Sequence, residues 1–381
     1  MKILNSPLML FTSVCLTLAA TANPAWSQLP VNASALTPYA SGLQGPRGLT
    51  FGPDGYLYVA EGGTGGTIAT GTSCTQVPAP IGPYTGGATA RISRIDEQGT
   101  RSTVAKGLPS AADAVGDIAG VADVTFLDGS LYALLAGGGC SHGNSALPNG
   151  IVKVNTRNGS WKYITNLSAF YARHPAAYPN AGDFEADGEP YSLIAWNGQL
   201  FSVEANHGQI VRTSPQGGNS LIADISSHLG HIVPTGLAES HGNLYVANLG
   251  QFPVTPDWEK LMTFSRDMSF FDITPGLETR PSEIGSFRLA AVRAGLSAVL
   301  SLKFGPDGLL YALEFSTAAA MPTPGTGKVV RLKRNGDFED VVTGLSVPTG
   351  MTFGPDGALY ISNFGAAPPG AGQILRIDLP E

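Results

Sequence analysis

The stretch Phe51-Gly-Pro-Asp-Gly-Tyr-Leu-Tyr-Val-Ala-Glu61 indicates the fold because the chain repeats it. Near copies are Phe304-Gly-Pro-Asp-Gly-Leu-Leu-Tyr-Ala-Leu-Glu314 and Phe353-Gly-Pro-Asp-Gly-Ala-Leu-Tyr-Ile-Ser-Asn363. Looser copies end in Leu131-Tyr132, Leu200-Phe201 and Leu244-Tyr245. Each copy has the pattern of a β-hairpin, with an apolar strand, a turn that contains Gly, and an alternating strand. Six hairpins of one kind predict a repeat architecture.

A third strand with polar and apolar residues in alternation follows most hairpins, as in Gly150–Asn155, Lys328–Lys333 and Gln373–Asp378. A turn such as Asn335-Gly336 then leads to a fourth strand, for example Phe338 to Leu345. Four antiparallel strands repeated six times are the pattern of β-propeller blades. The sequence therefore predicts an all-β fold, a six-bladed β-propeller with four-stranded antiparallel blades.

The two ends of the chain predict how the ring closes. The last repeat stops after its third strand at Leu379, whereas Leu36 to Leu43 ends in Ser-Gly-Leu before Pro46. We expect this N-terminal strand to complete the last blade, which would also cover open sheet edges.

The first 27 residues have the features of a secretory signal peptide: Lys2, an apolar run from Leu8 to Ala20, and a small-x-small site at Ala25-Trp26-Ser27. Residues 28–381 are then expected to form one propeller domain, located in the periplasm or secreted. No later apolar run is long enough to span a membrane. The net charge of −7 and the lack of basic clusters argue against nucleic acid or an anionic membrane as partner.

Two cysteines lie in the mature chain, Cys74 and Cys140, both in Gly-rich segments that follow the Leu-Tyr strands of neighbouring repeats. In an oxidising compartment we expect a disulfide between them. Two separate buried thiols are the alternative.

Five long segments are predicted either to follow strand two of a blade or to join two blades, at residues 62–90, 137–149, 170–189, 249–259 and 315–327. They should share one face, opposite the hairpin turns, and long loops on a rigid frame are where binding usually occurs. An insertion from about Met268 to Ile284 should project from the other face.

The residue three positions after each repeated aromatic forms one predicted ring: Glu61, Leu135, Glu204, Asn248, Glu314 and Asn363. These oxygens could hold Ca²⁺ or another hard cation. We favour a structural interpretation, in which each side chain hydrogen-bonds backbone amides of the loop that it enters.

The starts of the innermost strands give a second ring: Arg47, Ala122, Tyr191, Thr235, Leu300 and Thr349. Arg47 is its only charged member and could bind a ligand carboxylate. Pairing with a neighbouring acid such as Glu61 is slightly favoured.

Histidines concentrate in the predicted long loops: His142, His174, His207, His228 and His231, with Asp183, Glu185, Asp187, Glu189 and Glu204 nearby. Imidazole and carboxylate together suit a transition metal or acid–base chemistry. Their spacing contains no tight ligand motif, so each histidine alone is more typical of a hydrogen-bonded loop residue. His207 and His231 are the best candidates to face a binding site. No nucleophile or phosphate-binding motif is present.

The repeated motif resembles the NHL and SMP-30/gluconolactonase group of six-bladed propellers. Glu204-Ala-Asn-His-Gly208, Gly230-His-Ile-Val-Pro-Thr235 and Asn243-Leu-Tyr-Val-Ala-Asn-Leu-Gly-Gln-Phe-Pro253 are similar to the ScyD/ScyE family of exported cyanobacterial propellers, named for the scytonemin gene cluster. The resemblance covers essentially the whole mature chain and implies a periplasmic or extracellular propeller.

The gluconolactonase branch implies a metal-dependent hydrolase with Glu, Asn and Asp ligands around the axis. The matching positions here are Arg47, Tyr191, Thr235 and Thr349, which departs from that ligand set.

Our leading hypothesis is an exported scaffold that binds a small molecule, a polysaccharide or another exported protein through its long-loop face, without catalysis or a cofactor. It would serve scytonemin-type secondary metabolism or the extracellular matrix. The candidate ligand-binding residues are Arg47, Glu61, Tyr191, Glu204, His207, His231, Thr235, Asn248, Glu314, Thr349 and Asn363. The alternative is a hydrolase or isomerase that uses the histidine and acid cluster with Ca²⁺ or another divalent metal.

Overall fold

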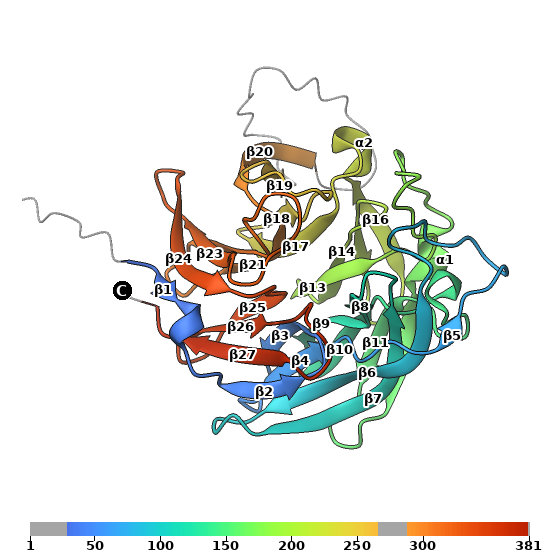
Figure 1. The fold of residues 1–381 in the computed structure, drawn as a ribbon, viewed down its shortest axis with the longest axis horizontal. Coiled ribbons are helices and arrows are strands. Elements are labelled where there is room, and N and C mark those ends of the chain that lie inside the picture. The colour runs from blue at the N-terminus through green and yellow to red at the C-terminus, as the bar shows by residue number, and fades with distance from the viewer. Residues whose placement is uncertain (1–28, 266–287, 380–381) are drawn as a thin grey trace, which may run out of the picture.

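Six antiparallel sheets surround a central axis in the computed structural model, which describes residues 29–265 and 288–379 (Figure 1). The fold is the predicted six-bladed β-propeller. One strand of every blade lines a cavity on the axis, because Gly48, Ala122, Tyr191, Leu237, Leu300 and Gly350 all border it.

The blades follow one another along the chain, each from its innermost strand outward. Blade 1 contains β3 (Pro46–Phe51), β4 (Leu57–Glu61), β6 (Thr85–Ile95) and β7 (Arg101–Ala112). Blade 2 contains β9 (Val121–Leu127), β10 (Ser130–Leu135), β11 (Gly150–Val154) and β12 (Trp161–Asn166). Blade 3 contains β13 (Pro190–Trp196), β14 (Gln199–Glu204), β15 (Gln209–Thr213) and β16 (Asn219–Asp224).

The second half of the ring repeats the pattern. Blade 4 contains β17 (Pro234–Ser240), β18 (Asn243–Asn248), β19 (Glu259–Ser265) and β20 (Arg288–Leu296). Blade 5 contains β21 (Val299–Phe304), β22 (Leu310–Glu314), β23 (Gly327–Leu332) and β24 (Phe338–Leu345). Blade 6 contains β25 (Gly350–Phe353), β26 (Leu359–Asn363), β27 (Gly372–Ile377) and β2 (Ala40–Leu43).

The residues of the repeated motif contact one another at the hairpin end of each blade that carries it, as blade 6 shows. The hydroxyl of Tyr360 donates a hydrogen bond to Asp356 Oδ2 at 3.0 Å, and the same bond forms in blades 1 and 5. A side chain at Gly354 would place its Cβ 2.7 Å from the ring of Tyr360, so the motif needs glycine there. The ring of Tyr360 also packs edge-on against Phe51 of the next blade, at a centroid distance of 5.0 Å.

The N-terminal strand closes the ring as predicted. β2 pairs antiparallel with β27, and its Leu43 is fully buried among residues of blades 1 and 6. A second strand was not predicted: β1 (Val31–Asn32) lies parallel to β24 at the outer edge of blade 5. The start of the described chain therefore covers the edges of two neighbouring blades.

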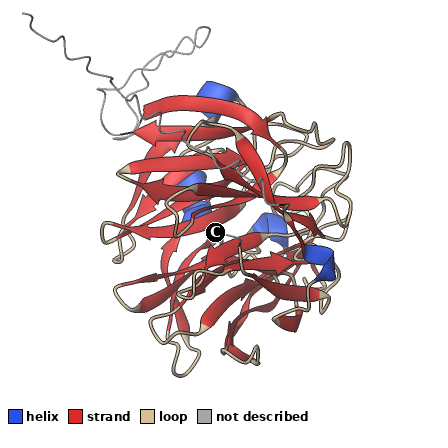
Figure 2. Cartoon of the chain, turned by 90° about the vertical axis from the view of Figure 1, so that its left-hand side faces the viewer, coloured by secondary structure: helices blue, strands red, loops and turns tan. Residues whose placement is uncertain are grey.

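The loops divide between two faces as expected (Figure 2). Short hairpin turns lie at one end of the strands, on the left in this view, and the longer loops lie at the other end. The longer loops include η2 (Cys140–His142), α1 (Leu167–Tyr171) and α2 (Ser226–Leu229), and we call this side the long-loop face. The short helix η1 (Ala33–Ala35) belongs to the N-terminal segment.

The prediction that residues 62–90 form a loop is wrong in part. The segment 62–90 contains the short strand β5 (Ile68–Ala69) and the first part of β6, which pairs with β5 and continues along β7. A further strand, β8 (Ile118–Ala119), pairs with the end of β7. Blade 1 is therefore wider than the other blades at the long-loop face. The insertion at about Met268 to Ile284 lies outside the described residues.

No helix in the described ranges is long and apolar enough to cross a membrane.

Truncating Leu43 tests the closure of the ring. Leu43→Ala should lower the free energy of unfolding by about 2–5 kcal/mol, because it leaves a cavity between the first and last blades. Urea unfolding of the mature protein measures the change. The matched control is Leu29→Ala, at a side chain that is 87% exposed, which should be neutral. Equal effects of the two substitutions would contradict this closure.

Candidate functional site

Five members of the predicted ring at the ends of the second strands bond to the backbone that leads into their own blades, and the sixth, Leu135 of blade 2, has no polar side chain. Glu61 Oε2 accepts a hydrogen bond from Gln44 N at 2.7 Å, and Asn363 Oδ1 accepts one from Ser346 N at 2.8 Å. Asn248 Nδ2 donates to Ile232 O at 2.9 Å. The corresponding bonds in blades 3 and 5 join Glu204 to Glu189 N and Glu314 to Ser297 N.

The structural interpretation of this ring is confirmed, with one correction to its detail. The bonded groups lie mainly in the segment that precedes the first strand of the blade, rather than in the loop after the second strand. Glu204 contacts both, because it also accepts hydrogen bonds from Asn206 N at 2.9 Å and His207 N at 2.5 Å.

Two of the three acidic members of this ring are neutralised from the third strand. Glu61 lies opposite Arg91 in the strand register, and the two form an ion pair at 2.7 Å. Glu314 lies opposite Lys328, with 3.6 Å between Nζ and Oε2. Burial nevertheless raises the pKa of Glu314 to about 7, against the opposing charge of Lys328. The fold thus occupies both oxygens of Glu61, whereas Glu314 Oε2 lies near Lys328 but accepts no hydrogen bond from the described residues.

In blade 3 a histidine, and not a residue of the third strand, balances the buried acid Glu204. Glu204 lies opposite the uncharged Gln209, and His207 Nδ1 approaches Glu204 Oε2 at 3.4 Å instead. Burial acts to raise the pKa of Glu204, but the charge of His207 and the backbone amides outweigh it and lower that pKa. The His207 ring stacks on Tyr171 at 5.2 Å and is 2% exposed, so it lies beneath the surface.

Arg47 pairs with a neighbouring acid, as predicted, but this acid is Asp117 and not the Glu61 that we named. Arg47 does not pair with Glu61, which is taken by Arg91; its Nη2 contacts Asp117 Oδ1 at 2.9 Å and Ile118 O at 2.7 Å. Burial alone would lower the pKa of Arg47, but Asp117 and the hydroxyl of Tyr191 raise it. The guanidinium therefore stays charged and is balanced by a partly exposed carboxylate.

Other inner-ring side chains join adjacent blades. Thr235 Oγ1 donates to Val299 O, and Thr349 Oγ1 donates to Pro46 O, each at 2.5 Å. These hydroxyls stabilise the ring. Whether the buried residues of either ring also contact a ligand stays a prediction.

Asp123, which we did not single out from the sequence, makes a comparable bond. Its Oδ2 accepts from Leu193 N of the next blade at 2.8 Å. Burial raises the pKa of Asp123 to about 6, with Lys303 opposing. Both side chains line the axial cavity, which has a volume of about 10 Å³, roughly the space of one water molecule.

An acidic segment, residues 183–189, crosses between the loops of several blades. Asp183 Oδ2 contacts His231 Nε2 at 2.9 Å. Glu185 Oε2 contacts His142 Nε2 at 3.0 Å. Asp187 Oδ2 accepts hydrogen bonds from Ser141 N and Oγ at 2.8 and 2.7 Å. The structure thus brings together part of the predicted histidine and acid cluster, as loop-to-loop contacts.

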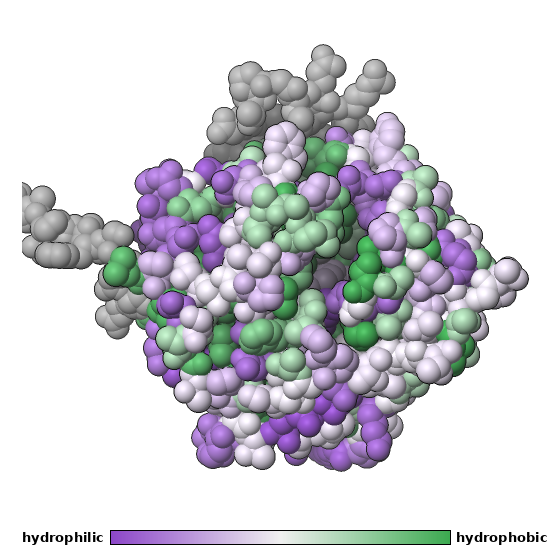
Figure 3. All heavy atoms as spheres, in the orientation of Figure 1, coloured by the Kyte–Doolittle hydropathy of each residue, from purple (hydrophilic) through white to green (hydrophobic). Residues whose placement is uncertain are grey.

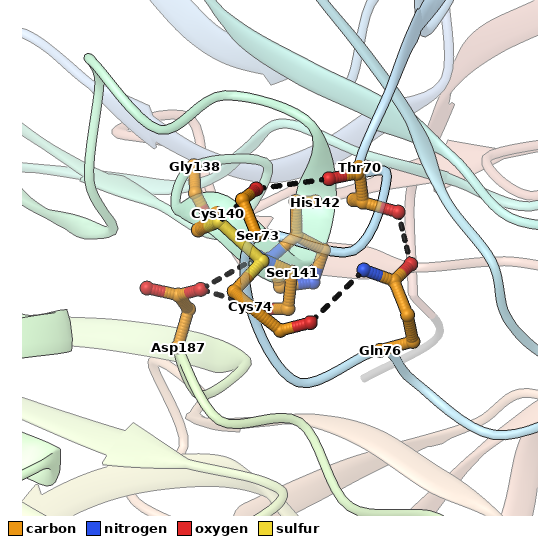
Figure 4. The surroundings of a disulfide bond; sticks show 9 residues. All are labelled: Thr70, Ser73, Cys74, Gln76, Gly138, Cys140, Ser141, His142 and Asp187. Atoms are coloured by element: carbon orange, nitrogen blue, oxygen red, sulfur yellow. Dashed lines mark hydrogen bonds between the residues drawn. A yellow bond between two sulfur atoms is a disulfide. The ribbon is translucent and has the colours of Figure 1, made fainter.

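The disulfide Cys74–Cys140 forms as predicted and lies beside this segment (Figure 4). It joins the long loop of blade 1 to η2, which carries Ser141 and His142. A disulfide of this kind persists in oxidising compartments.

His142 is fully buried and bonded at both ring nitrogens. Nδ1 faces Gly138 O at 2.8 Å and Nε2 faces Glu185 at 3.0 Å, so both nitrogens face acceptors. A neutral imidazole has one N–H, so making both bonds as a donor requires the charged ring. Burial would lower the pKa of His142, but Glu185 outweighs it and holds that pKa above its ordinary value. The hydroxyl of Tyr84, from the loop of blade 1, donates to Glu185 Oε1 at 3.1 Å.

The long-loop face is hollowed near its centre, and polar and apolar residues both border the hollow (Figure 3). Tyr191 shares one apolar cluster with the partly buried Leu249, Val347 and Ala366 of blades 4 to 6, because all four pack against the same buried side chains, which include Leu300 of the inner ring. Arg47, Asp117 and Glu189, from blades 1 to 3, lie close enough to one another to interact electrostatically. We call the region around these seven residues the axial hollow.

The residues around the axis do not fit the metal site that the gluconolactonase resemblance implies. Its matching positions hold a guanidinium at Arg47 and two hydroxyls, Thr235 and Thr349, that donate to carbonyl groups. In residues 29–265 and 288–379, no group of three His, Cys, Asp or Glu side chains is arranged to hold a metal ion. We therefore derive no reaction step through a metal.

The fold is similar to solved SMP-30/gluconolactonase-like propellers. A gluconolactonase of Xanthomonas campestris is 13% identical with a TM-score of 0.51, over 90% of this chain and 88% of that one. A proposed glucose dehydrogenase of Thermus thermophilus is 16% identical with a TM-score of 0.51, over 90% and 99%. A proposed gluconolactonase is 12% identical with a TM-score of 0.50, over 90% and 92%.

Comparison with protein-family models gives no match, and comparison with curated proteins gives none either. At the identities found, the solved structures establish the fold alone. They establish the propeller fold, and they leave the activity of this chain to be argued from its own residues.

The His142–Glu185 pair predicts a pH-dependent stability. A pKa raised by folding stabilises the protein fully below the unfolded pKa of histidine, about 6.5, and this stabilisation is lost as pH rises through the folded value. The difference in unfolding free energy between wild type and His142→Gln should therefore shrink with rising pH. Urea titrations at several pH values measure it.

His241→Asn is the matched control, because His241 lies in a hairpin turn on the opposite face. Its difference from wild type should not change with pH. A His142→Gln difference that stayed constant or grew on raising the pH would contradict the charged pair.

Proposed function

We propose that this protein binds a small organic molecule in the axial hollow and serves as a binding scaffold rather than a catalyst. The observation that carries the proposal is that the hollow has polar groups on one side and apolar side chains on the other. Tyr191 belongs to both sides: Arg47, Asp117 and Glu189 of blades 1 to 3 act on it electrostatically, and it shares an apolar cluster with side chains of blades 4 to 6. A concave site with an apolar wall and a few polar groups is typical of small-molecule binding.

The contacts of the two rings favour binding over hydrolysis. The carboxylates that could act on a substrate, Glu61, Glu204 and Glu314, are at most 1% exposed and bond to backbone amides. Of the predicted set, the proposed site uses Arg47 and Tyr191, which lie within electrostatic reach of each other. The gluconolactonase-like neighbours fit either a scaffold or a hydrolase, because they share only the fold.

A small molecule suits this site better than a polysaccharide or a protein. The hollow lies where the first strands of the blades converge, and the loops of blades 1 to 3 are tied to one another by the disulfide and by Glu185. A polymer or a protein would need an extended groove or a broad patch.

Export belongs to the same proposal. It rests on the predicted signal peptide at residues 1–27 and on a disulfide suited to an oxidising compartment. Membership in the ScyD/ScyE family, and a link to scytonemin-type metabolism, rest on the three segments quoted above and are proposed on that basis.

Blocking the hollow tests the proposal. Benzamide, a ring with one neutral polar group, should bind the mature protein weakly at about millimolar concentration, as befits a fragment. Ligand-detected NMR measures this. Ala366→Trp should abolish binding because the indole occupies the apolar wall. Ala294→Trp on the outer strand β20, an exposed site, is the control and should bind like wild type. Failure to bind, or binding unaffected by Ala366→Trp, would overturn the proposal.

A further inference from the structure

Four acids alternate along the segment Asp183-Phe184-Glu185-Ala186-Asp187-Gly188-Glu189, and the first three are accounted for by the fold. Asp183, Glu185 and Asp187 bond to His231, His142 and Ser141 respectively. The fourth, Glu189, is different. Its backbone N–H donates to Glu204, yet none of the described residues donates a hydrogen bond to its carboxyl group.

Glu189 lies at the axial hollow and not under it. It precedes Pro190, the first residue of β13, and is two residues before Tyr191 of the inner ring. Its side chain is partly exposed, in contrast to the buried Glu61, Glu204 and Glu314. A carboxyl group that no protein partner satisfies, beside a hollow, is available to a ligand.

The groups facing Glu189 favour its protonated form. Burial, and then the charges of Glu185, Asp117 and Asp183, raise the pKa of Glu189 well above its ordinary value, while Arg47 opposes them. The hydroxyls of Tyr84 and Tyr191 also lie within its electrostatic reach. A protonated carboxyl group offers one O–H donor, which an ionised one lacks.

We propose that Glu189 is the residue that recognises the ligand, donating a hydrogen bond to an acceptor oxygen of a neutral molecule whose apolar part packs on Tyr191, Leu249 and Val347. The proposal rests on the small-molecule binding proposed above and adds the chemical class of the ligand. It also assigns Glu189, which sequence reasoning placed only in a general acidic cluster.

A ligand with either a negative or a positive charge would bind unfavourably beside Glu189. An anionic group would meet the carboxylates of Asp117 and Asp183, which already oppose the ionisation of Glu189. A cationic group would approach the guanidinium of Arg47 and would have to displace the proton of Glu189. A carbonyl, ether or hydroxyl oxygen meets neither obstacle.

Three probes with the same ring test the class of head group: benzamide, benzoate and benzylammonium. On the wild-type mature protein, benzamide should bind tightest, and its affinity should fall as pH rises through the pKa of Glu189. Glu189→Gln keeps a neutral donor, so its affinity should stay within about threefold of wild type at low pH and become independent of pH. Glu189→Ala should weaken benzamide roughly tenfold.

Glu97→Gln is the matched control, because Glu97 is exposed in the turn between β6 and β7 on the opposite face. It should retain the wild-type affinity and pH profile.

The outcomes separate the two proposals. Lack of binding by all three probes, or binding that Ala366→Trp leaves unchanged, overturns small-molecule binding in the hollow and this inference with it. Binding that Ala366→Trp abolishes, but with a charged probe preferred or with the same pH profile in wild type and Glu189→Gln, overturns the role of Glu189 alone.

Discussion

The contact between the tyrosine of one blade and the phenylalanine of the next holds the hairpin end of this propeller together. It recurs between Tyr58 and Phe126, Tyr245 and Phe304, Tyr311 and Phe353, and Tyr360 and Phe51, with ring centroids 5.0–5.2 Å apart. Each edge-on pair contributes about 0.5–1.5 kcal/mol beyond the area it buries. The contact recurs at four of the six blade junctions among the described residues, so the hairpin end is largely regular, whereas the loops at the other end differ from blade to blade.

The long-loop end depends on a different set of bonds. In five of the six blades a side chain at the end of the second strand bonds to the backbone before the first strand. Thr235, Thr349 and Asp123 join neighbouring first strands near the axis. These buried polar groups rigidify the frame around the axial hollow. The loops of blades 1 to 3 are joined to one another in turn by Glu185, Asp187 and the disulfide. Glu189 belongs to the same acidic segment, but its carboxyl group accepts no hydrogen bond from the described residues.

The sequence predicts the frame well because the frame is repetitive. Asp-Gly turns and Leu-Tyr strands mark the hairpins, and the incomplete last repeat predicts the closure by β2. The pairs Glu61–Arg91 and Glu314–Lys328 follow from the strand register, so they could have been found by aligning the third strands. The same alignment assigns Glu61 to Arg91 and leaves Arg47 to another acid.

The partners in the hollow are less predictable. Asp117 reaches Arg47 only because β6 and β7 extend beyond the length of an ordinary blade strand, and segment 62–90 gave no alternation to indicate this. Contacts such as Tyr84–Glu185 join loops about a hundred residues apart, and no local pattern encodes such a distance. The sequence likewise does not show that the carboxyl group of Glu189 lacks a hydrogen-bond donor. That becomes clear only once the partners of Asp183, Glu185 and Asp187 are known.

The central claim is that backbone amides and His207 keep Glu204 ionised, whereas the partly exposed Glu189 accepts no hydrogen bond from the described residues and is left to the hollow. A ¹³C NMR titration of the glutamate side-chain carboxyls tests it most directly, with the Glu189 signal assigned by its loss in Glu189→Gln. The account predicts that Glu204 titrates below the ordinary glutamate range and that Glu189 titrates well above it. Ordinary titration of Glu189, together with a raised pKa at Glu204, would contradict the account.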